Sequence, residues 1–164
     1  MSSIDINKFQ TILKGMNFDG WLFYDFRGSN DLALNILKVP KESHLTRRFY
    51  YFIPAEGTPV KIVNGIEAHN LNHLPGEQLL YSSHSILTGH LSKILKNVKT
   101  IAMEYSPMNA IPYVSKVDAG TIEQIKSFGV EIKSSADLIS LFDAVWTKEQ
   151  YEDNIPVANA LYEI

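Results

Sequence analysis

The sequence predicts an α/β domain built as a three-layer α/β/α sandwich, with helices on both faces of a mixed β-sheet. Segments with strand-like and helix-like patterns alternate along the whole chain, which is typical of α/β domains. Residues 21–24, Trp-Leu-Phe-Tyr, form a continuous apolar run, as expected of a central strand buried on both faces. An aromatic segment and a β-branched segment flank a turn at residues 54–58. They predict a hairpin, and therefore a sheet that is not purely parallel.

The first half of the chain begins with a helix that Asp5 can cap and that ends near Gly15. Its apolar face recurs at helical spacing and consists of Phe9, Ile12, Leu13 and Met16. After the central strand we expect hairpin strands at 47–53 and 59–63, a helix at 66–73, a strand at 78–81 and a helix at 85–95. The four aromatic residues at 49–52 should divide between the two faces of the sheet and belong to the core.

The second half repeats the alternation. A strand is expected at 100–105, and Asp118 should cap a helix that runs through Phe128 and ends at Gly129. A strand at 130–133 and a helix at 136–145 follow. The last helix carries Tyr151, Ile155, Ala158 and Tyr162 at helical spacing. Pro156 should kink or break it, because an internal proline removes a backbone hydrogen bond at a cost of about 3 kcal/mol.

Composition excludes several classes of protein. A chain of 164 residues with 45% hydrophobic residues fits one domain with a core of its own. It has no cysteine, no N-glycosylation sequon and no basic segment followed by an apolar run at its start, so we expect a cytoplasmic protein that does not enter the membrane. The net charge of −3 argues against a nucleic-acid partner, since phosphate binding needs clustered lysine and arginine.

Common catalytic motifs are missing. Two groups of residues could form a metal site, but a purely structural role explains each group better. Neither a GxSxG elbow, a GxGxxG loop nor a Walker A loop occurs. Glu67, His69 and His73 could hold zinc on one helix face, but Asn70 stands where an HExxH motif has its glutamate, so a solvated helix end is favoured.

A second alternative is a magnesium-dependent nuclease site made by Asp25, Glu104 and Asp118, which follow strands or precede helices. The acidic charge balance and the lack of a basic track oppose it. Helix capping, turn formation and ion pairing explain these three carboxylates better.

The loop at residues 25–30, Asp-Phe-Arg-Gly-Ser-Asn, is the best remaining candidate for binding. It leaves the carboxyl end of the central strand and enters a helix that Ser29 or Asn30 can cap, where backbone amides favour anions. Arg27 could add a bidentate contact to a carboxylate, or it could simply pair with a neighbouring acid. Arg47 and Arg48 would point to opposite faces of a strand, so at most one of them should face a given cleft.

Residues 101–121, IAMEYSPMNAIPYVSKVDAGT, are the most constrained stretch of the chain, with two prolines between a strand end and a capped helix start. This stretch resembles the N-terminal, creatinase-type domain of the M24 metallopeptidase family, which includes Xaa-Pro aminopeptidases, Xaa-Pro dipeptidases (prolidases) and creatinase. The resemblance continues at residues 25–30, 45–48, 128–131, 134–138 and 144–146. Departures are Asp31, Phe49 and Lys116, where such sequences tend to have proline, tryptophan and arginine.

The resemblance implies a ribonuclease H-like motif in the fold and a division of the chain into two parts. Residues 1–146 would form the creatinase-type domain, and residues 147–164 would begin a linker helix toward a C-terminal pita-bread domain that this chain lacks. Two divalent metal ions (Mn, Zn or Co) would be bound in that absent domain by two Asp, one His and two Glu. No catalytic residue, metal ligand or cofactor is therefore expected in this chain, and the sequence would be a domain of a longer enzyme.

The resemblance also implies a task for this domain: dimerisation, and shaping or gating of the substrate pocket of a peptidase acting on short peptides. In creatinase-like homodimers this domain reaches the active site of the partner subunit, where a basic side chain can meet a substrate carboxylate. Arg27, Asn30 and Arg48 are the residues expected to do so here. The alternatives are an independent binding or scaffold module, and the accessory domain of a creatinase or another amide hydrolase.

Overall fold

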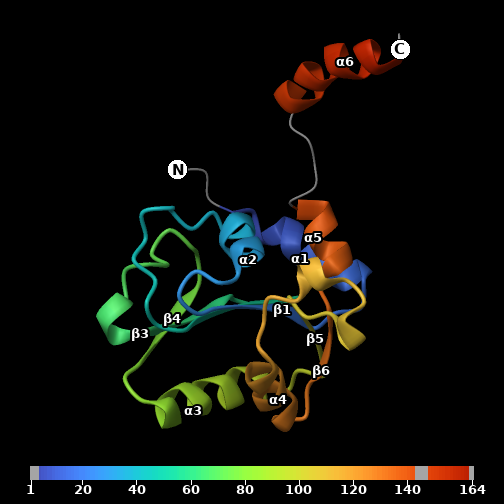
Figure 1. Ribbon diagram of the computed structural model, residues 1–164. Coiled ribbons are helices and arrows are strands. Elements are labelled where there is room, and N and C mark those ends of the chain that lie inside the picture. The colour runs from blue at the N-terminus through green and yellow to red at the C-terminus, as the bar shows by residue number, and fades with distance from the viewer. Residues whose placement is uncertain (1–3, 143–147, 163–164) are drawn as a thin grey trace.

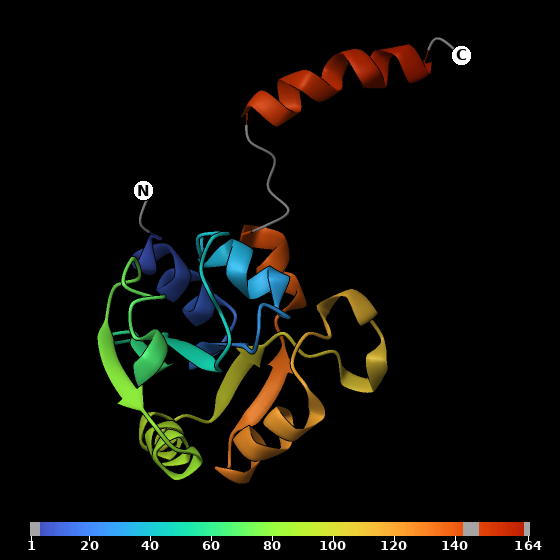
Figure 2. The ribbon, with the colours of Figure 1, turned by 60° about the vertical axis from the view of Figure 1, so that its left-hand side comes forward.

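The computed structural model describes residues 4–142 and 148–162. Within these residues, six strands form one sheet in the order β4-β3-β2-β1-β5-β6. Helices α1, α2 and α5 cover one face of the sheet, and α3 and α4 cover the other (Figures 1 and 2). The predicted three-layer α/β/α arrangement is confirmed.

The strands are β1 (Gly20–Asp25), β2 (Phe49–Pro54), β3 (Val60–Asn64), β4 (Glu77–Tyr81), β5 (Thr100–Met103) and β6 (Glu131–Ser134). The α-helices are α1 (Ile6–Gly15), α2 (Asp31–Ile36), α3 (His84–Leu95), α4 (Ala119–Ser127), α5 (Ala136–Phe142) and α6 (Lys148–Tyr162). Three short 3₁₀ turns among the described residues are η1 (Gly65–Glu67), η2 (Pro107–Asn109) and η3 (Pro112–Val114).

The sheet is mixed, as predicted. Strand β1 pairs antiparallel with β2 and parallel with β5, and β2 pairs antiparallel with β3 as the expected hairpin. Strands β1 and β2 approach closely at Gly20, where an added Cβ atom would lie 2.4 Å from the Phe52 ring and 2.9 Å from the Ile53 carbonyl oxygen. Only glycine fits at this position without a shift of the neighbouring strand.

Strand β1 supplies side chains to both cores, which explains its continuous apolar sequence. Trp21 and Phe23 pack beneath α1, α2 and α5, whereas Leu22 and Tyr24 pack beneath α3 and α4. Residues 49–52 alternate in the same way, and all four are buried. The prediction that these aromatic residues belong to the core is confirmed.

Side-chain caps fix the helix starts that the sequence indicates. The Asp5 carboxylate accepts a hydrogen bond from the Lys8 amide at 3.2 Å, and the Asp118 carboxylate accepts one from the Thr121 amide at 2.9 Å. Gly129 follows α4 with a φ of +83°, a conformation that favours glycine at the end of a helix. Both predicted caps and this helix end are confirmed.

The predicted helix at residues 66–73 is wrong. Residues 66–73 form a 3₁₀ turn and further turns instead of an α-helix. The backbone hydrogen bonds here join amides to carbonyls three residues earlier, as in Asn70 to Glu67 and Asn72 to His69, both at 3.1 Å, which is the pattern of turns and not of an α-helix. The Lys61 ammonium also donates to the carbonyl oxygens of Leu71 at 3.4 Å and Leu74 at 2.8 Å. Helix α6 continues through Pro156, so the proline does not end the helix.

The predicted end of the helix at Val145 and the predicted domain boundary after residue 146 lie outside the described residues. Helix α5 is described to Phe142. None of the helices in the described ranges is long and apolar enough to cross a lipid bilayer.

Candidate functional site

The candidate residues gather at the edge of the sheet where β1, β3, β4 and β5 end and β2 begins. The loop after β1 is closed by the Asp25 carboxylate, which is fully buried. It accepts hydrogen bonds from the Gly28 amide at 2.8 Å and the Asn30 amide at 2.9 Å. Arg27 and Gly28 adopt left-handed conformations with φ of +60° and +73°, which turns the chain sharply toward α2.

A buried polar network lies beneath this loop, centred on Glu104. One carboxylate oxygen of Glu104 accepts from the Trp21 indole at 2.7 Å and from the Ser135 hydroxyl at 3.3 Å. The other accepts from the Asn30 amide group at 2.8 Å. Burial, the largest effect, raises the pKa of Glu104 to about 7 against the opposing effect of these hydrogen bonds.

Asn30 is the helix cap that the sequence left open between Ser29 and Asn30. Its side-chain nitrogen donates to the Tyr24 carbonyl at 2.7 Å as well as to Glu104, and its side-chain oxygen accepts from the Ala33 amide at 3.0 Å. The Leu32 amide donates to Asp31. The Leu32 and Ala33 amides at the start of α2 are thus already bound by side chains, although an anion would need them. The Asn30 side chain is buried and points into the fold.

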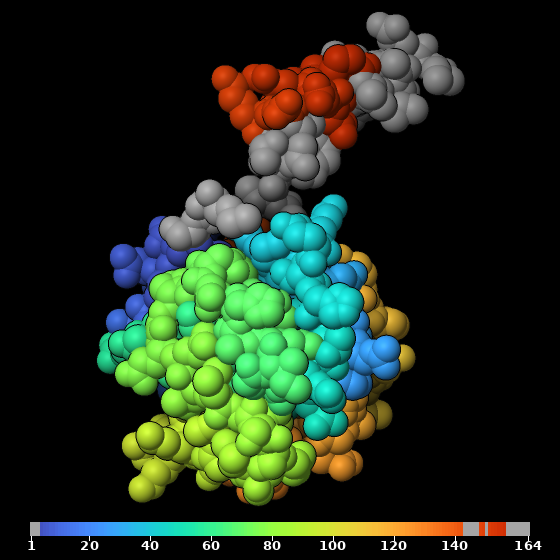
Figure 3. Space-filling model, turned by 90° about the vertical axis from the view of Figure 1, so that its left-hand side faces the viewer, coloured from blue at the N-terminus to red at the C-terminus, as the bar shows by residue number. Residues whose placement is uncertain are grey.

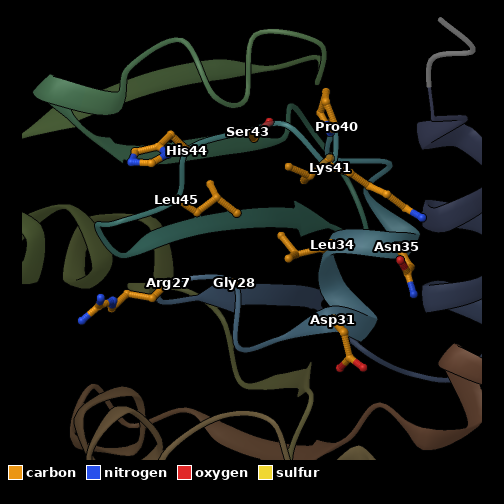
Figure 4. Close-up of a pocket in the computed structure, with 11 residues that line it drawn as sticks. Arg27, Gly28, Asp31, Leu34, Asn35, Pro40, Lys41, Ser43, His44 and Leu45 are labelled. Atoms are coloured by element: carbon orange, nitrogen blue, oxygen red, sulfur yellow. The ribbon is translucent and has the colours of Figure 1, made fainter.

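Arg27 lies at the tip of the same loop and is exposed. It forms no ion pair with any described residue. Asp31, the acidic residue that lines the same pocket, pairs with Lys116 at 2.9 Å instead. A pocket of about 420 Å³ separates α2 from residues 39–45, and Arg27 lies at its rim with the guanidinium directed away from Asp31 (Figure 4). The guanidinium is therefore available to a ligand or a partner chain.

Arg48 is exposed directly ahead of β2, and its position is fixed from three directions. Its guanidinium carbon lies 5.6 Å from the centre of the Phe26 ring, and its carbonyl oxygen accepts from the Tyr81 hydroxyl at 2.8 Å. The buried Glu67 carboxylate accepts from the Thr46 hydroxyl, from the Thr46 amide at 2.9 Å and from the Arg47 amide at 3.2 Å. Segments 38–48 and 65–76 lie side by side on one face of the molecule (Figure 3).

The expectation that only one of Arg47 and Arg48 faces a given cleft is wrong. Both line a pocket of about 340 Å³ together with residues of β4 and the start of α3. They precede β2 instead of lying within it, so the alternation of side chains along a strand does not separate them.

Arg48 and His84 connect this pocket to a second one of about 350 Å³, between the starts of α3 and α4. We call the two pockets together the α3–α4 groove; Asp118, Gly120, Thr121 and Gln124 line its second half. Tyr50 is buried beside it, and its hydroxyl has no hydrogen-bond partner among the described residues. Burial raises the pKa of Tyr50, with a smaller contribution from Tyr24.

The residues of the alternative zinc and magnesium sites do not come together, and most of them make structural hydrogen bonds. Glu67 binds Thr46 and Arg47, while a ring nitrogen of His73 lies 3.0 Å from the Leu37 carbonyl oxygen. Asp25 closes a turn and Asp118 caps α4, as the sequence indicates, whereas Glu104 accepts hydrogen bonds from Trp21, Asn30 and Ser135. In the part of the chain that the structure describes, no group of three or more such side chains is placed to hold a metal ion.

The loop between β5 and α4 exposes large apolar side chains. Met108 is 97% exposed, Tyr113 62% and Ile111 49%. The Lys116 and Val117 amides both donate to the Glu104 carbonyl oxygen at 3.0 Å, so the base of the loop is tied to the strand end. The predicted sequence of strand end, proline-containing loop and capped helix is confirmed.

Sequence reasoning missed two residues of this edge: Glu104 as a buried acid, and Glu67 as the group that holds Thr46 and Arg47. A signal existed only for Glu104, which directly follows the apolar residues of β5. The partners of Glu67 lie 20 and 21 positions away in the sequence, where no local pattern points to them.

Neither a protein-family model nor a curated protein matches the sequence. Solved structures do match in fold. The prolidase from Pyrococcus horikoshii superimposes with a TM-score of 0.60 and 15% sequence identity, over 90% of this chain and 37% of that one. The X-Pro aminopeptidase from Thermotoga maritima gives a TM-score of 0.61 and 14% identity, over 90% of this chain and 38% of that one.

An isolated domain matches over nearly its whole length. The creatinase/prolidase N-terminal domain of an X-Pro dipeptidase from Streptococcus pyogenes superimposes with a TM-score of 0.59 and 14% identity, over 85% of this chain and 98% of that one. The chain thus spans less than two fifths of the whole prolidase, whereas it superimposes on nearly the whole length of the isolated domain. At these identities the comparison establishes the fold.

Proposed function

We propose that this chain, which has the fold of the creatinase/prolidase N-terminal domain, is the non-catalytic N-terminal domain of a metal-dependent Xaa-Pro peptidase. One observation carries the proposal: the chain covers 98% of an isolated N-terminal domain of an X-Pro dipeptidase and only 37% of a whole prolidase. Residues 1–146 would be this domain, and residues 147–164 would begin the linker to a catalytic domain. The enzyme would be cytoplasmic.

The proposed domain contributes to the substrate pocket in a homodimer. Arg27 and Arg48 are exposed and have no ion-pair partner among the described residues, so either guanidinium can meet the carboxylate of a short peptide in the partner subunit. Asn30 contributes by positioning Arg27, because its buried side chain holds the loop that carries Arg27. The exposed side chains of Met108, Ile111 and Tyr113 supply an apolar surface for contact with the rest of the enzyme.

The two divalent ions of such an enzyme, Mn, Zn or Co, belong to its catalytic domain. The described residues of this chain do not fit a metal centre, since their carboxylates and imidazoles are dispersed over the fold. This chain therefore takes no step of the hydrolysis, and its purified form should not cleave peptides in the presence of these ions.

The test is Arg48→Ala in the enzyme that contains this domain, assayed with an Xaa-Pro substrate and with the same substrate amidated at its carboxyl end. Loss of a charge-assisted contact worth about 1.5–3 kcal/mol should raise KM for the free acid by roughly 10- to 100-fold. The amidated substrate should be affected far less. Lys96→Ala, at an exposed position after α3, is the control. An unchanged kcat/KM for the free acid would refute the assigned role of Arg48.

An independent binding module is the second candidate, because the α3–α4 groove is complete within one copy of the chain. The gene sequence beyond Ile164 separates the two: two Asp, one His and two Glu at metal-binding positions support the peptidase, and their absence supports the binding module. An amide hydrolase related to creatinase would show the same ligands and differ in its substrate.

A further inference from the structure

Glu104 is a buried carboxyl group that the proposed function does not use. Its side chain is fully buried, and the three side chains that bind it, Trp21, Asn30 and Ser135, are all uncharged. Burial raises the pKa of Glu104 to about 7, so the ionised and the protonated carboxyl are both present near neutral pH. The polar network around Glu104 must therefore accommodate a proton in one of its two states.

Two of the three partners cannot accept that proton. The Trp21 indole, 2.7 Å from Oε1 of Glu104, is a donor only. The Asn30 side-chain nitrogen lies 2.8 Å from Oε2. Its orientation is fixed, because the nitrogen also donates to the Tyr24 carbonyl and the side-chain oxygen accepts from the Ala33 amide. A proton on Oε2 would therefore face an N–H donor.

Ser135 is the partner that can reverse its role. A hydroxyl both donates and accepts, and the Ser135 hydroxyl makes no other hydrogen bond with the described residues. Its distance of 3.3 Å from Oε1 is long, since O–H···O bonds in proteins are commonly about 2.7 Å. Oε1 of Glu104 can direct a proton at Ser135 and still accept from Trp21 with a remaining lone pair.

We propose that Glu104 and Ser135 form a proton-operated switch that controls how firmly the loop at residues 25–30 is held. In the ionised state Glu104 accepts from Asn30 with a negative charge, and such charge-assisted bonds are about twice as strong as neutral ones. In the protonated state Glu104 donates to Ser135, and the hydrogen bond from Asn30 becomes a neutral one. Protonation thus strengthens one contact of Glu104 and weakens another.

These two contacts lead to different helices. Asn30 caps α2 and closes the loop that carries Arg27. Ser135 directly precedes α5, and its amide donates to the Met103 carbonyl of β5 at 3.0 Å. Protonation of Glu104 therefore loosens the start of α2 and the loop with Arg27, and it tightens the contact between β5 and α5.

The elements that form the network also carry charged side chains: Asp25, Asp31, Lys116, Lys133 and Asp137. Asp31 pairs with Lys116, and the Asp25 carboxylate accepts from two amides of the loop. Lys133 and Asp137 are exposed. None of these charges is among the causes of the raised pKa of Glu104, so burial and the hydrogen bonds control its protonation.

The experiment is a pH titration of the 164-residue chain by NMR, with ¹³C-labelled glutamate to follow the Glu104 carboxyl, assigned by comparison with Glu104→Gln. In Ser135→Ala the protonated carboxyl loses its acceptor, so the midpoint should fall by about one pH unit, a tenfold weaker affinity for the proton. A hydroxyl that only donates to the carboxylate would have the opposite effect when removed. A raised or unchanged midpoint would therefore overturn the proposal.

The control for this titration is Ser134→Ala. The Ser134 hydroxyl accepts from the Ala136 amide and makes no hydrogen bond with Glu104, so this variant should leave the midpoint unchanged. An equal fall of the midpoint in Ser134→Ala would show that the start of α5 acts as a whole, and it would refute the specific role of Ser135.

The loop amides give a second readout. The Gly28 and Asn30 amide signals should titrate with the midpoint of the Glu104 carboxyl, and they should follow it when Ser135→Ala moves it. The Asp25 carboxylate binds the same two amides but makes no hydrogen bond with Ser135, so signals that Asp25 controls would keep their midpoint. Loop amides that do not follow Glu104 would contradict its control of the loop. All readouts use this chain alone, so they do not depend on the proposed catalytic partner.

Discussion

Replacing Glu104 by glutamine should remove the part of the pH dependence of this domain's stability that comes from Glu104. The pKa of Glu104 is raised from 4.5 to about 7, chiefly by burial. In the unfolded chain the carboxyl returns to water and to its ordinary pKa. Between these two values the unfolded chain releases the proton while the folded chain keeps it.

The sign follows from this difference. The contribution of Glu104 to the free energy of unfolding is greatest below pH 4.5, where Glu104 is protonated in both states, and it decreases as the pH rises toward about 7. A shift of this size corresponds to a loss of about 3 kcal/mol across the window. The contribution of Glu104 should level off at higher pH, because Glu104 is then ionised in both states.

Glutamine removes the titration but does not fit the network. Trp21 and Asn30 both donate to Glu104 from opposite sides, so the amide nitrogen of a glutamine must face one of these donors. The Asn30 side chain cannot turn over in response, since its oxygen accepts from Ala33. Glu104→Gln should therefore lower the free energy of unfolding by about 1–3 kcal/mol at acidic pH, and the gap to the unmodified protein should narrow as the pH rises.

The assay is urea unfolding across this pH range, followed by Trp21 fluorescence in a Trp146→Phe background. Trp21 reports on the site directly through its hydrogen bond to Glu104. Glu123→Gln changes an exposed carboxyl on α4 and serves as the control. A difference between Glu104→Gln and the unmodified protein that stays constant with pH would refute the assigned titration.

Two further predictions concern the backbone and the segment ahead of β2. Gly20→Ala should lower the free energy of unfolding by about 1–3 kcal/mol, because its Cβ would lie 2.4 Å from the Phe52 ring. The added Cβ of Gly89→Ala in α3 meets no atom within 4 Å, so this variant should raise the free energy of unfolding by up to about 1 kcal/mol. Thermal unfolding compares the two variants, and equal effects would contradict the close packing at Gly20. Glu67→Gln should cost about 1–3 kcal/mol and accelerate hydrogen exchange at the Thr46 and Arg47 amides, whereas unaltered exchange there would show that Glu67 does not hold this segment.

The parts of the fold with local signals were predictable from the sequence. Asp5 and Asp118 cap the helices that follow them, and the apolar run at residues 21–24 lies in the central strand. Each of these features depends on neighbours within a few positions along the chain. The composition of the run also indicated burial on both faces of the sheet, since no polar residue interrupts it.

The parts that depend on distant contacts were not predictable. The segment after β3 forms turns, and Lys61 binds it through the Leu71 and Leu74 carbonyls, 10 and 13 positions away. Glu104 meets Trp21 across 83 positions and Asn30 across 74, so its burial follows from the packing of the sheet. The candidate site was predicted in part, since Arg27 and Arg48 are exposed at the expected edge. The α3–α4 groove was not predicted, because Arg48 ahead of β2 and the starts of α3 and α4 line it together only in the folded chain.

The position of β1 has a consequence for how the domain loses its structure. Its alternate side chains, Trp21 and Phe23 on one face and Leu22 and Tyr24 on the other, belong to the two different cores. The strand itself is paired on both sides, antiparallel with β2 and parallel with β5. Removing the helices of one face would expose half of β1 to water and weaken the backbone pairing on which the other face depends. The two halves should therefore melt as a single cooperative unit, and hydrogen exchange at the β1 amides should require opening of the whole domain.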